Sequence, residues 1–335
     1  MVPDLKDLPA IFPLLGLLLA LYYVWSVLDF LWFHYLRPRS WVRFLRGPKP
    51  YALITGATDG IGRSAAKELY VKGFNLVLHG RSDEKMKQTV EEVKAANPRS
   101  GLDVKYFIAD VSQPNIDFQG IARQYGDLNI TLFVNNVGAS FPTNKLYVPF
   151  DFPYAGTESR PRLDQLDEEL ITSVMNINAR FPCFITRAFL PFLRTNSQNG
   201  PVEVVFVGSF SGDVAVPFVS FYAGSKALTK RVCLILQSEE RVLTKSKLSF
   251  VYVNVGEVQS GTVRVAASLT RPRSDDYAKH LVESFGSGRG VVIPHPVHHI
   301  IYSIVTGMPE ILRDYIVLAE SKKLFKKMEE GMKDR

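Results

Sequence analysis

Tyr222 and Lys226 stand four residues apart in a stretch, residues 220–237, that has a helical pattern, and Ser209 precedes Tyr222 by thirteen residues. Residues at positions i and i+4 share one face of a helix, so a phenol and an ammonium would be presented together. At an effective dielectric of about 20, a cation about 4 Å from a phenolate contributes about 4 kcal/mol before desolvation. We therefore expect Lys226 to lower the pKa of Tyr222 toward neutrality and to make Tyr222 a proton donor.

A glycine-rich loop over residues 55–62 follows the apolar segment 51–54 and precedes a helical pattern that runs to about Lys72. Glycines permit a tight turn and let backbone N–H groups approach a pyrophosphate at the positive end of a helix. A second apolar segment, residues 75–79, completes a βαβ unit. The sequence therefore predicts a nucleotide-binding loop whose contacts come from Thr55, Gly56, Thr58, Asp59, Gly60, Ile61 and Gly62.

The residues after the second and third predicted strands indicate which dinucleotide binds. Folds that prefer the unphosphorylated cofactor usually carry an acidic residue after the second strand. This chain has Arg81 there, and a guanidinium can pair with a 2′-phosphate. The sequence therefore predicts NADPH as the cofactor. Asp110, after the apolar segment 104–108, is expected either to receive the adenine amino group or to cap the next helix.

Further motifs follow the loop in the order and spacing found in short-chain dehydrogenases/reductases, and the chain resembles that family over about residues 50–262. These motifs are Asn135-Asn136-Val137-Gly138, Asn178, Ser209, Tyr222 and Lys226. The resemblance implies that Tyr222 donates a proton to a substrate carbonyl and that Ser209 holds the carbonyl oxygen. It also implies that Lys226 binds the nicotinamide ribose.

The same resemblance implies further roles around the cofactor. Asn178, with Asn176 as its rival, would hold a water relay to Lys226. After the sixth strand the family commonly has Pro-Gly followed by a threonine, whereas this chain has Val255 in place of the proline and Ser260 as the hydroxyl. Because proline fixes φ, its loss is expected to soften this loop. The additional cofactor contacts implied by the resemblance are Asn136, Gly138, Tyr222, Lys226, Val255 and Ser260.

The alternation of apolar segments and helical patterns predicts the fold. The apolar segments begin at Tyr51, Asn75, Val104, Ile130, Val202 and Leu248. This order predicts an α/β fold with a doubly wound parallel sheet of the Rossmann type. The chain of 335 residues is expected to form one reductase domain over residues 50–320 and a charged tail over 321–335. Segments 140–166 and 259–290 leave from the carboxyl edge of the sheet and are expected to form pocket walls and a lid, with surface insertions as the alternative.

The N-terminal region has the features of a membrane anchor. Residues 8–28 form 21 uncharged positions, and such a helix would extend about 31 Å, close to the hydrocarbon thickness of a bilayer. A cleavable signal peptide is the alternative, but it would have a basic leader and a shorter apolar core. We expect a transmembrane helix within an anchor over residues 1–36, followed by a basic linker over 37–49. The positive-inside rule then places the catalytic domain in the cytoplasm.

Charge and metal-ligand content exclude other classes of function. Five cations of the basic linker account for most of the net charge of +7, and membrane topology explains them without nucleic-acid binding. Cys183 and Cys233 fit a reducing compartment. We expect no metal, because the histidines near the C-terminal region have no cysteine or carboxylate ligand at a suitable spacing. These histidines are His295, His298 and His299.

The anchor, the basic linker, Asp59 in the glycine-rich loop and the late histidine- and proline-containing stretch resemble a membrane subgroup of the family. It comprises microsomal very-long-chain 3-oxoacyl-CoA reductases and related 17β-hydroxysteroid dehydrogenases. The resemblance implies reduction of a lipid ketone, most directly 3-oxoacyl-CoA, at the endoplasmic reticulum membrane during fatty-acid elongation, as a homodimer or with elongase partners. A 17β-hydroxysteroid reductase, a 3-ketosphinganine reductase and a non-catalytic nucleotide-binding scaffold are the alternatives.

Overall fold

The computed structural model describes residues 8–139, 163–243, 246–260 and 266–333. The chain divides into two compact units, Met1–Ser40 and Trp41–Arg335. The smaller unit contains the N-terminal apolar helix, and the larger unit contains the sheet and all the predicted site residues.

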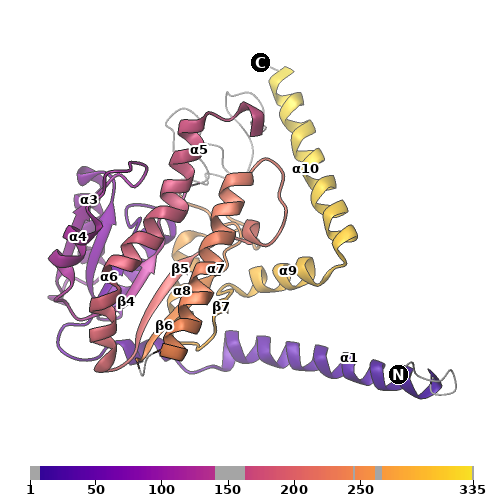
Figure 1. Cartoon of the computed structure of the whole chain (residues 1–335), viewed down its shortest axis with the longest axis horizontal. Coiled ribbons are helices and arrows are strands. Elements are labelled where there is room, and N and C mark those ends of the chain that lie inside the picture. Colours follow the sequence, from indigo (N-terminus) through magenta and orange to yellow (C-terminus); the bar gives the residue numbers. More distant parts are fainter. Residues whose placement is uncertain (1–7, 140–162, 244–245, 261–265, 334–335) are drawn as a thin grey trace. The chain divides into compact units, whose positions relative to one another are not determined.

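The larger unit is built on a parallel sheet, which among the described residues has seven strands in the order β3-β2-β1-β4-β5-β6-β7 (Figure 1). The strands are β1 (Tyr51–Ile54), β2 (Asn75–Gly80), β3 (Val104–Ile108), β4 (Ile130–Asn135), β5 (Val202–Val207), β6 (Leu248–Val253) and β7 (Val291–Val292). The chain enters the sheet at β1, near its middle, and runs outward through β2 to β3. It then returns to β4, which lies beside β1. This doubly wound order confirms the predicted fold class, and each of the six predicted strands is present. The two-residue strand β7 was not predicted.

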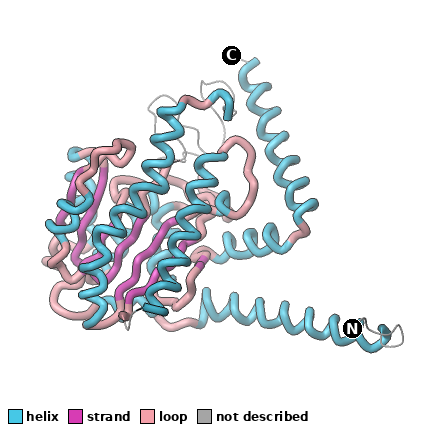
Figure 2. The backbone as a smooth tube through the Cα atoms, in the orientation of Figure 1, coloured by secondary structure: helices cyan, strands magenta, loops and turns pink. Residues whose placement is uncertain are grey.

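Helices cover the sheet, as the parallel pairing requires. The α-helices described in the larger unit are α2 (Gly60–Val71), α3 (Asp83–Ala96), α4 (Phe118–Tyr125), α5 (Glu168–Met175), α6 (Phe181–Gln198), α7 (Ser220–Leu243), α8 (Ser274–Ser284), α9 (Pro296–Gly307) and α10 (Glu310–Lys333), of which α2, α3, α6 and α7 pack on strands. Helices α6 and α7 pack against strands β4, β5 and β6 and lie in front of the sheet in Figure 2, whereas α8 packs against α2. The strands are therefore shielded from water by helices that the crossovers supply.

The core explains why the strand sequences are mostly apolar. Every residue of β1, β2, β4 and β5 is buried, so these strands do not alternate between apolar and polar positions. Phe133, Phe189 and Phe250 are completely buried between the sheet and its helices. By contrast, the edge strand β3 is only partly buried. The carboxyl ends of the central strands are thus held rigidly, which is where a parallel sheet presents its functional loops.

The segments expected to form pocket walls and a lid are described only in part. Residues 140–162 lie outside the described residues, as do residues 261–265 of the second segment. The described remainder of the second segment contains α8, which packs on α2. Gln259 pairs with Arg273 at the start of that helix. A lid function for this segment stays a prediction.

The smaller unit contains α1 (Leu8–Leu31), which continues as a wider turn over Trp32–Leu36. The stretch Phe12–Leu36 has 25 residues and a mean hydropathy of 2.0, and none of its most apolar window is buried against the protein. By length and composition, this helix is able to cross a membrane. Its outward-facing side chains include Trp25, which is 70% exposed.

Deletion of residues 1–36 is expected to release the protein from membranes. The deletion removes the whole exposed apolar helix, whose transfer from lipid to water is unfavourable at about 25 cal/mol per Å² of apolar surface. The measurement is the partition between pellet and supernatant after an alkaline wash. A chimera in which an unrelated spanning helix replaces residues 1–36 should return to the pellet. Full membrane retention of the deleted form would place the anchor elsewhere in the chain.

Candidate active site

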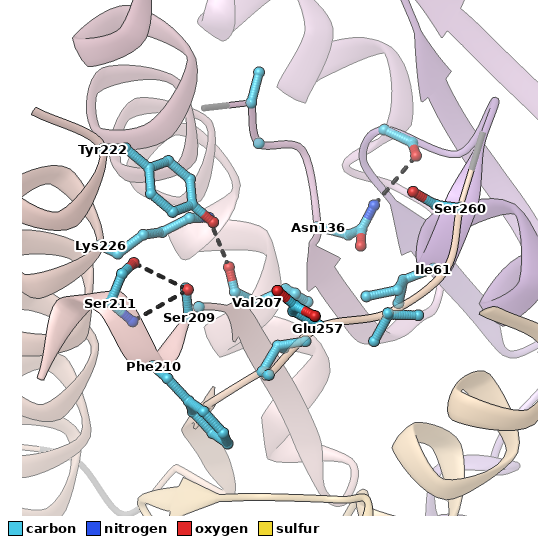
Figure 3. Close-up of a pocket in the computed structure, with 18 of the residues that line it drawn as sticks. Ile61, Asn136, Val207, Ser209, Phe210, Ser211, Tyr222, Lys226, Glu257 and Ser260 are labelled. Atoms are coloured by element: carbon cyan, nitrogen blue, oxygen red, sulfur yellow. Dashed lines mark hydrogen bonds between the residues drawn. The ribbon is translucent and has the colours of Figure 1, made fainter. Parts of the chain in front are cut away.

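A cavity of about 480 Å³ opens at the carboxyl ends of β1, β4, β5 and β6 (Figure 3). Its lining comes from the loops that follow these strands, from α7 and from α9. Most of the predicted site residues line it: Gly56, Thr58, Asp59, Gly60, Ile61, Asn136, Gly138, Ser209, Tyr222, Lys226, Val255 and Ser260. The remaining five, Thr55, Gly62, Arg81, Asp110 and Asn178, lie outside this lining.

The glycine-rich loop is shaped for close backbone approach. A side chain at Gly62 would place its Cβ 2.2 Å from the carbonyl oxygen of Gly56, and Gly56 itself has a φ of +65°. Asp59 is the N-cap of α2 and accepts a hydrogen bond of 2.6 Å from the N–H of Gly60. The helix therefore begins directly at the cavity, with its positive end toward the space that a pyrophosphate would fill. These residues fit a dinucleotide.

Thr55 and Asn136 connect the glycine-rich loop to the loop after β4. Thr55 is completely buried, and its Oγ1 accepts hydrogen bonds from the N–H groups of Asn136 (3.0 Å) and Val137 (3.2 Å). The Asn136 amide in turn donates to the carbonyl oxygens of Thr55 and Gly56, each at 3.1 Å. Thr55 thus shapes the loop from beneath, while Asn136 both braces the loop and faces the cavity.

Arg81 and Asp110 lie at the ends of the neighbouring strands. Arg81 is exposed directly after β2. Its neighbour Gly80 lies so close to the glycine-rich loop that a Cβ at residue 80 would be 2.5 Å from the Thr58 Cγ2. Asp110 is exposed and its Oδ1 accepts hydrogen bonds from the N–H (3.1 Å) and hydroxyl (2.8 Å) of Ser112. Asp110 therefore forms a local turn, and the N-cap of α4 is a different residue, Asp117.

Replacing Arg81 by aspartate is expected to shift cofactor preference from NADPH toward NADH. The substitution exchanges a cation for an anion beside the expected 2′-phosphate, and a hydrogen bond to a charged group contributes about 1.5–3 kcal/mol. The kcat/KM for NADPH divided by the kcat/KM for NADH should fall by at least about tenfold. Lys87→Ala is the matched control, because that lysine pairs with Asp83 on α3 instead. An unchanged ratio in Arg81→Asp would remove Arg81 from phosphate recognition.

Ser209, Tyr222 and Lys226 are brought together by β5 and α7 (Figure 3). The Lys226 ammonium is buried, donates a hydrogen bond of 3.0 Å to the carbonyl oxygen of Val207 and lies 5.8 Å from the centre of the Tyr222 ring. Ser209 caps the short helix Phe210–Gly212, and its Oγ accepts hydrogen bonds from the N–H (3.3 Å) and the hydroxyl (3.0 Å) of Ser211. Two hydroxyls and an ammonium thus converge on one wall of the cavity.

Burial is the main influence on the pKa values of Tyr222 and Lys226. The expectation that Lys226 would lower the pKa of Tyr222 toward neutrality was wrong for the geometry found. Burial raises the pKa of Tyr222, and a hydrogen bond from Ser209 only partly opposes this. Burial also lowers the pKa of Lys226 to about 8. Desolvation disfavours the charged forms of both side chains, the phenolate of Tyr222 and the ammonium of Lys226. Tyr222 therefore stays protonated at neutral pH.

Asn178 is the asparagine that lies beside Lys226. It belongs to a wide helical turn, Asn176–Arg180, that joins α5 to α6. Its Oδ1 accepts from the Ala139 N–H (3.0 Å) and its amide donates to the Ala139 carbonyl (2.6 Å). A Cβ at Gly138 would lie 3.0 Å from the Lys226 Nζ and 3.1 Å from the Asn178 Oδ1, so the three residues converge. Asn176 instead donates to the carbonyl of Ser112.

The loop after β6 is held by hydrogen bonds where the family's proline is missing. Val255 accepts a hydrogen bond of 3.0 Å from the N–H of Phe210, and the Asn254 amide donates to the Asp213 carboxylate at 2.7 Å. A Cβ at Gly60 would lie 3.0 Å from the Ser260 Cβ, so the end of the loop reaches the glycine-rich turn. These contacts oppose the softening expected from the loss of proline.

An apolar wall of the cavity was not predicted from sequence. It comes from Phe210, Val214 and Val216 after β5 and from Ile301, Tyr302 and Val305 on α9. The Tyr302 hydroxyl donates to the Asp213 carboxylate at 2.9 Å, and the Lys230 ammonium contacts the same carboxylate at 2.6 Å. The i, i+1, i+4 spacing of Ile301, Tyr302 and Val305 indicates one face of a helix. Sequence alone did not show that this face would line the cavity.

The histidines near the C-terminal region pack beside this wall. A Cβ at Gly256 would lie 3.1 Å from the ring of His298, and the His298 Nε2 lies 3.1 Å from the carbonyl of Thr270. Burial lowers the pKa of His295 to about 4. No cluster of three or more metal-ligating side chains occurs in the part of the chain that the structure describes. The His298 ring therefore packs against the loop after β6.

Comparisons with known proteins agree with this geometry. The family model for short chain dehydrogenase matches residues 50–271. A very-long-chain 3-oxoacyl-CoA reductase of Kluyveromyces lactis is 31% identical over 235 residues, covering 69% of this chain but only 60% of that protein. A mouse protein of the same name is 26% identical over 286 residues, covering 84% of this chain and 83% of that protein.

Solved structures share the fold. A short-chain dehydrogenase from Sphingobium yanoikuyae in complex with NADPH superimposes with a TM-score of 0.59 at 20% identity, covering 77% of this chain and 92% of that one. The match to the family model extends from the residue before β1 to the loop after β6, and so includes the glycine-rich loop and the Ser209, Tyr222 and Lys226 group. The chain belongs to the short-chain dehydrogenase/reductase family and is an NAD(P)-dependent oxidoreductase.

Proposed function

We propose that the protein is a membrane-anchored, NADPH-dependent reductase that converts a 3-oxoacyl-CoA to a 3-hydroxyacyl-CoA. The observation that carries this proposal is the convergence of Ser209, Tyr222 and Lys226 on a cavity that has a glycine-rich loop at one side and an apolar wall at the other. The names of the relatives from Kluyveromyces lactis and mouse support the acyl-CoA substrate.

Different residues would hold the different parts of the cofactor. The glycine-rich loop and the N-terminus of α2 would hold the pyrophosphate, and Arg81 would pair with the 2′-phosphate. Lys226 and Ser260 both line the cavity, where they would hold the nicotinamide ribose and amide. When bound, NADPH supplies the hydride that adds to the ketone carbon.

Tyr222, Ser209 and Lys226 supply and direct the proton. Tyr222, kept protonated by burial, donates its proton to the ketone oxygen, which becomes the product hydroxyl. Ser209 offers a hydroxyl to the same oxygen and orients it toward the phenol. The Lys226 ammonium stabilises the phenolate that forms, because it is held beside Tyr222 by its bond to the Val207 carbonyl. Asn178, braced by Ala139, would hold the water through which Tyr222 is reprotonated.

The shape and polarity of the cavity favour a lipid ketone. Val214, Val216, Ile301 and Val305 line the same cavity as Ser209 and Tyr222. Apolar side chains of this kind gain about 25 cal/mol for each Å² of lipid surface that they remove from water. An acyl chain therefore has a wall to contact while its ketone lies at the hydroxyls.

The anchor suggests where the reaction occurs. The helix Phe12–Leu36 is suited to span a bilayer, and five cations follow it in residues 37–49. By the positive-inside rule, we place the catalytic unit on the cytoplasmic side of the endoplasmic reticulum membrane, where acyl-CoA and NADPH are both accessible.

A substrate panel tests the proposal. Purified full-length protein in detergent micelles is given NADPH and either 3-oxostearoyl-CoA, estrone or 3-ketosphinganine, and product formation is followed by mass spectrometry. We expect kcat/KM to be highest for 3-oxostearoyl-CoA. A higher value for estrone or 3-ketosphinganine would replace the acyl-CoA assignment with the corresponding alternative. Absence of any product, with NADPH still bound, would favour the scaffold alternative.

A further inference from the structure

Tyr252 lies on β6 directly beneath the catalytic group, and its ring is completely buried. Its hydroxyl accepts a hydrogen bond from the N–H of Ser209 (3.3 Å) and donates one to the carbonyl of Lys226 (3.1 Å). One phenol therefore joins the turn after β5 to the middle of α7. Tyr252 does not line the cavity, so it acts on the site from behind.

Gly208 is shaped to accommodate this tyrosine. A Cβ at residue 208 would lie 1.9 Å from the Tyr252 Cζ and 2.0 Å from its Oη, distances at which atoms cannot coexist. The Gly208 N–H donates to the Val253 carbonyl at 2.8 Å, which fixes the glycine against β6. The residue immediately before Ser209 must therefore lack a side chain, because the ring of Tyr252 occupies that space.

The bridge connects the two backbone segments that carry the reacting hydroxyls. Ser209 comes from the turn after β5, and Tyr222 comes from the same helix, α7, that carries Lys226. Two other contacts on this side, from the Lys226 ammonium to the Val207 carbonyl and from the Lys230 ammonium to the Asp213 carboxylate, each depend on a flexible lysine side chain. The Tyr252 hydroxyl instead fixes backbone to backbone through a rigid ring.

We infer that Tyr252 is a positioning residue for carbonyl reduction: its hydroxyl sets the distance between the Ser209 hydroxyl and the Tyr222 phenol, and Gly208 is the glycine that makes room for it. The inference rests on the proposed reductase activity. Removing the hydroxyl leaves the partly buried Ser209 N–H without its partner, which costs about 1 kcal/mol and lets the turn move. A misplacement of about 1 Å at reacting groups lowers rates by up to about 10²-fold.

The first test is Tyr252→Phe in the full-length protein, measured on whichever ketone the wild type reduces best. We expect kcat to fall by about tenfold or more, while the KM for NADPH changes by less than about twofold, because the glycine-rich loop is untouched. Tyr125→Phe is the matched control, since Tyr125 is also buried and donates to a backbone carbonyl, that of Tyr106. The control should lose stability to a similar degree and keep the wild-type kcat.

Two results would overturn the inference: a wild-type kcat in Tyr252→Phe, or an equal loss of kcat in Tyr252→Phe and Tyr125→Phe. The second would mean that general loosening of the core accounts for the effect. If the protein prefers a ketone other than 3-oxoacyl-CoA, the acyl-CoA assignment fails but this test still stands. The kcat of Tyr252→Phe relative to wild type can then be measured on the preferred ketone.

A pair of variants at Gly208 separates the space that Tyr252 occupies from the hydrogen bonds that it makes. Gly208→Ala should destabilise the protein strongly because of the clash with the ring. The double variant Gly208→Ala/Tyr252→Ala should recover part of the melting temperature and retain the low kcat, since no hydroxyl bridges Ser209 and Lys226. A double variant with wild-type kcat would show that the bridge does not position the site.

Discussion

Replacing Tyr222 by phenylalanine should lower kcat by about 10²–10⁴-fold, the range that general acid catalysis contributes. Burial keeps the phenol protonated, and Tyr222 lines the cavity together with Ser209, which is why we propose it as the proton donor. Phenylalanine keeps the ring and removes only the transferable proton. The loss should therefore appear equally in kcat and kcat/KM, as expected when an interaction made in the transition state is removed.

The Tyr222→Phe experiment separates chemistry from binding. NADPH affinity, measured by fluorescence titration, should remain within about threefold of wild type because the hydroxyl contributes little to ground-state binding. Tyr125→Phe again serves as the control, since it removes a buried hydroxyl far from the cavity. Turnover of Tyr222→Phe comparable to wild type would mean that another group is the acid.

Changing Lys226 should alter both the rate and its pH dependence. Burial lowers the pKa of this lysine to about 8 and raises that of Tyr222. The active form needs a charged lysine and a protonated phenol. Below pH 8 both conditions hold, so kcat/KM for ketone reduction should be high; as pH rises through about 8, the ammonium loses its proton first and kcat/KM should fall. Lys226→Met should lose about 10²-fold at pH 7.

Lys226→Arg is the variant that assigns the alkaline limb. A guanidinium stays protonated to a pKa of about 12.5 or higher, so the fall near pH 8 should disappear or move upward even though the absolute rate is lower. If the limb stays near pH 8 in Lys226→Arg, a group other than Lys226 is titrating. The Lys230→Arg variant is the control, because Lys230 is on the same helix but pairs with Asp213.

The local elements of the site were predictable because each has a strong short-range signal. The strand at Tyr51–Ile54, the glycine-rich turn and the helix from Gly60 follow one another without a break, and the structure places them at those residues. The i, i+4 spacing of Tyr222 and Lys226 places both on one face of α7, where they line the same cavity. In each case the distance that matters is short along the chain.

Features that depend on contacts between distant segments were not predictable. The ring contact between Phe210 and Tyr302, at 5.0 Å between centroids, joins the turn after β5 to α9, and no periodicity within either segment specifies the other. The bridge from Tyr252 to Ser209 and Lys226 is of the same kind, as is the clash that requires glycine at residue 208.

The direction of the pKa shift of Tyr222 also depended on contacts between distant segments. Sequence supplied the neighbouring charge but not the extent of burial, and the burial of Tyr222 on α7, which packs on β5 and β6, raises its pKa. Asp110 also depended on tertiary context, because the structure gives the N-cap of α4 to Asp117 and shows Asp110 Oδ1 accepting hydrogen bonds from Ser112, while the adenine contact stays a prediction.

The sequence by itself determined the family, the doubly wound sheet and the apolar N-terminal helix, and it predicted the proton-transfer residues, since each of these rests on short segments whose patterns are readable along the chain. Only the tertiary structure decided which asparagine lies beside Lys226, which helix supplies the apolar wall, and how strongly burial holds the proton on Tyr222. The physical reason is that desolvation and packing depend on every neighbour in space, whereas a sequence motif specifies only its neighbours along the chain.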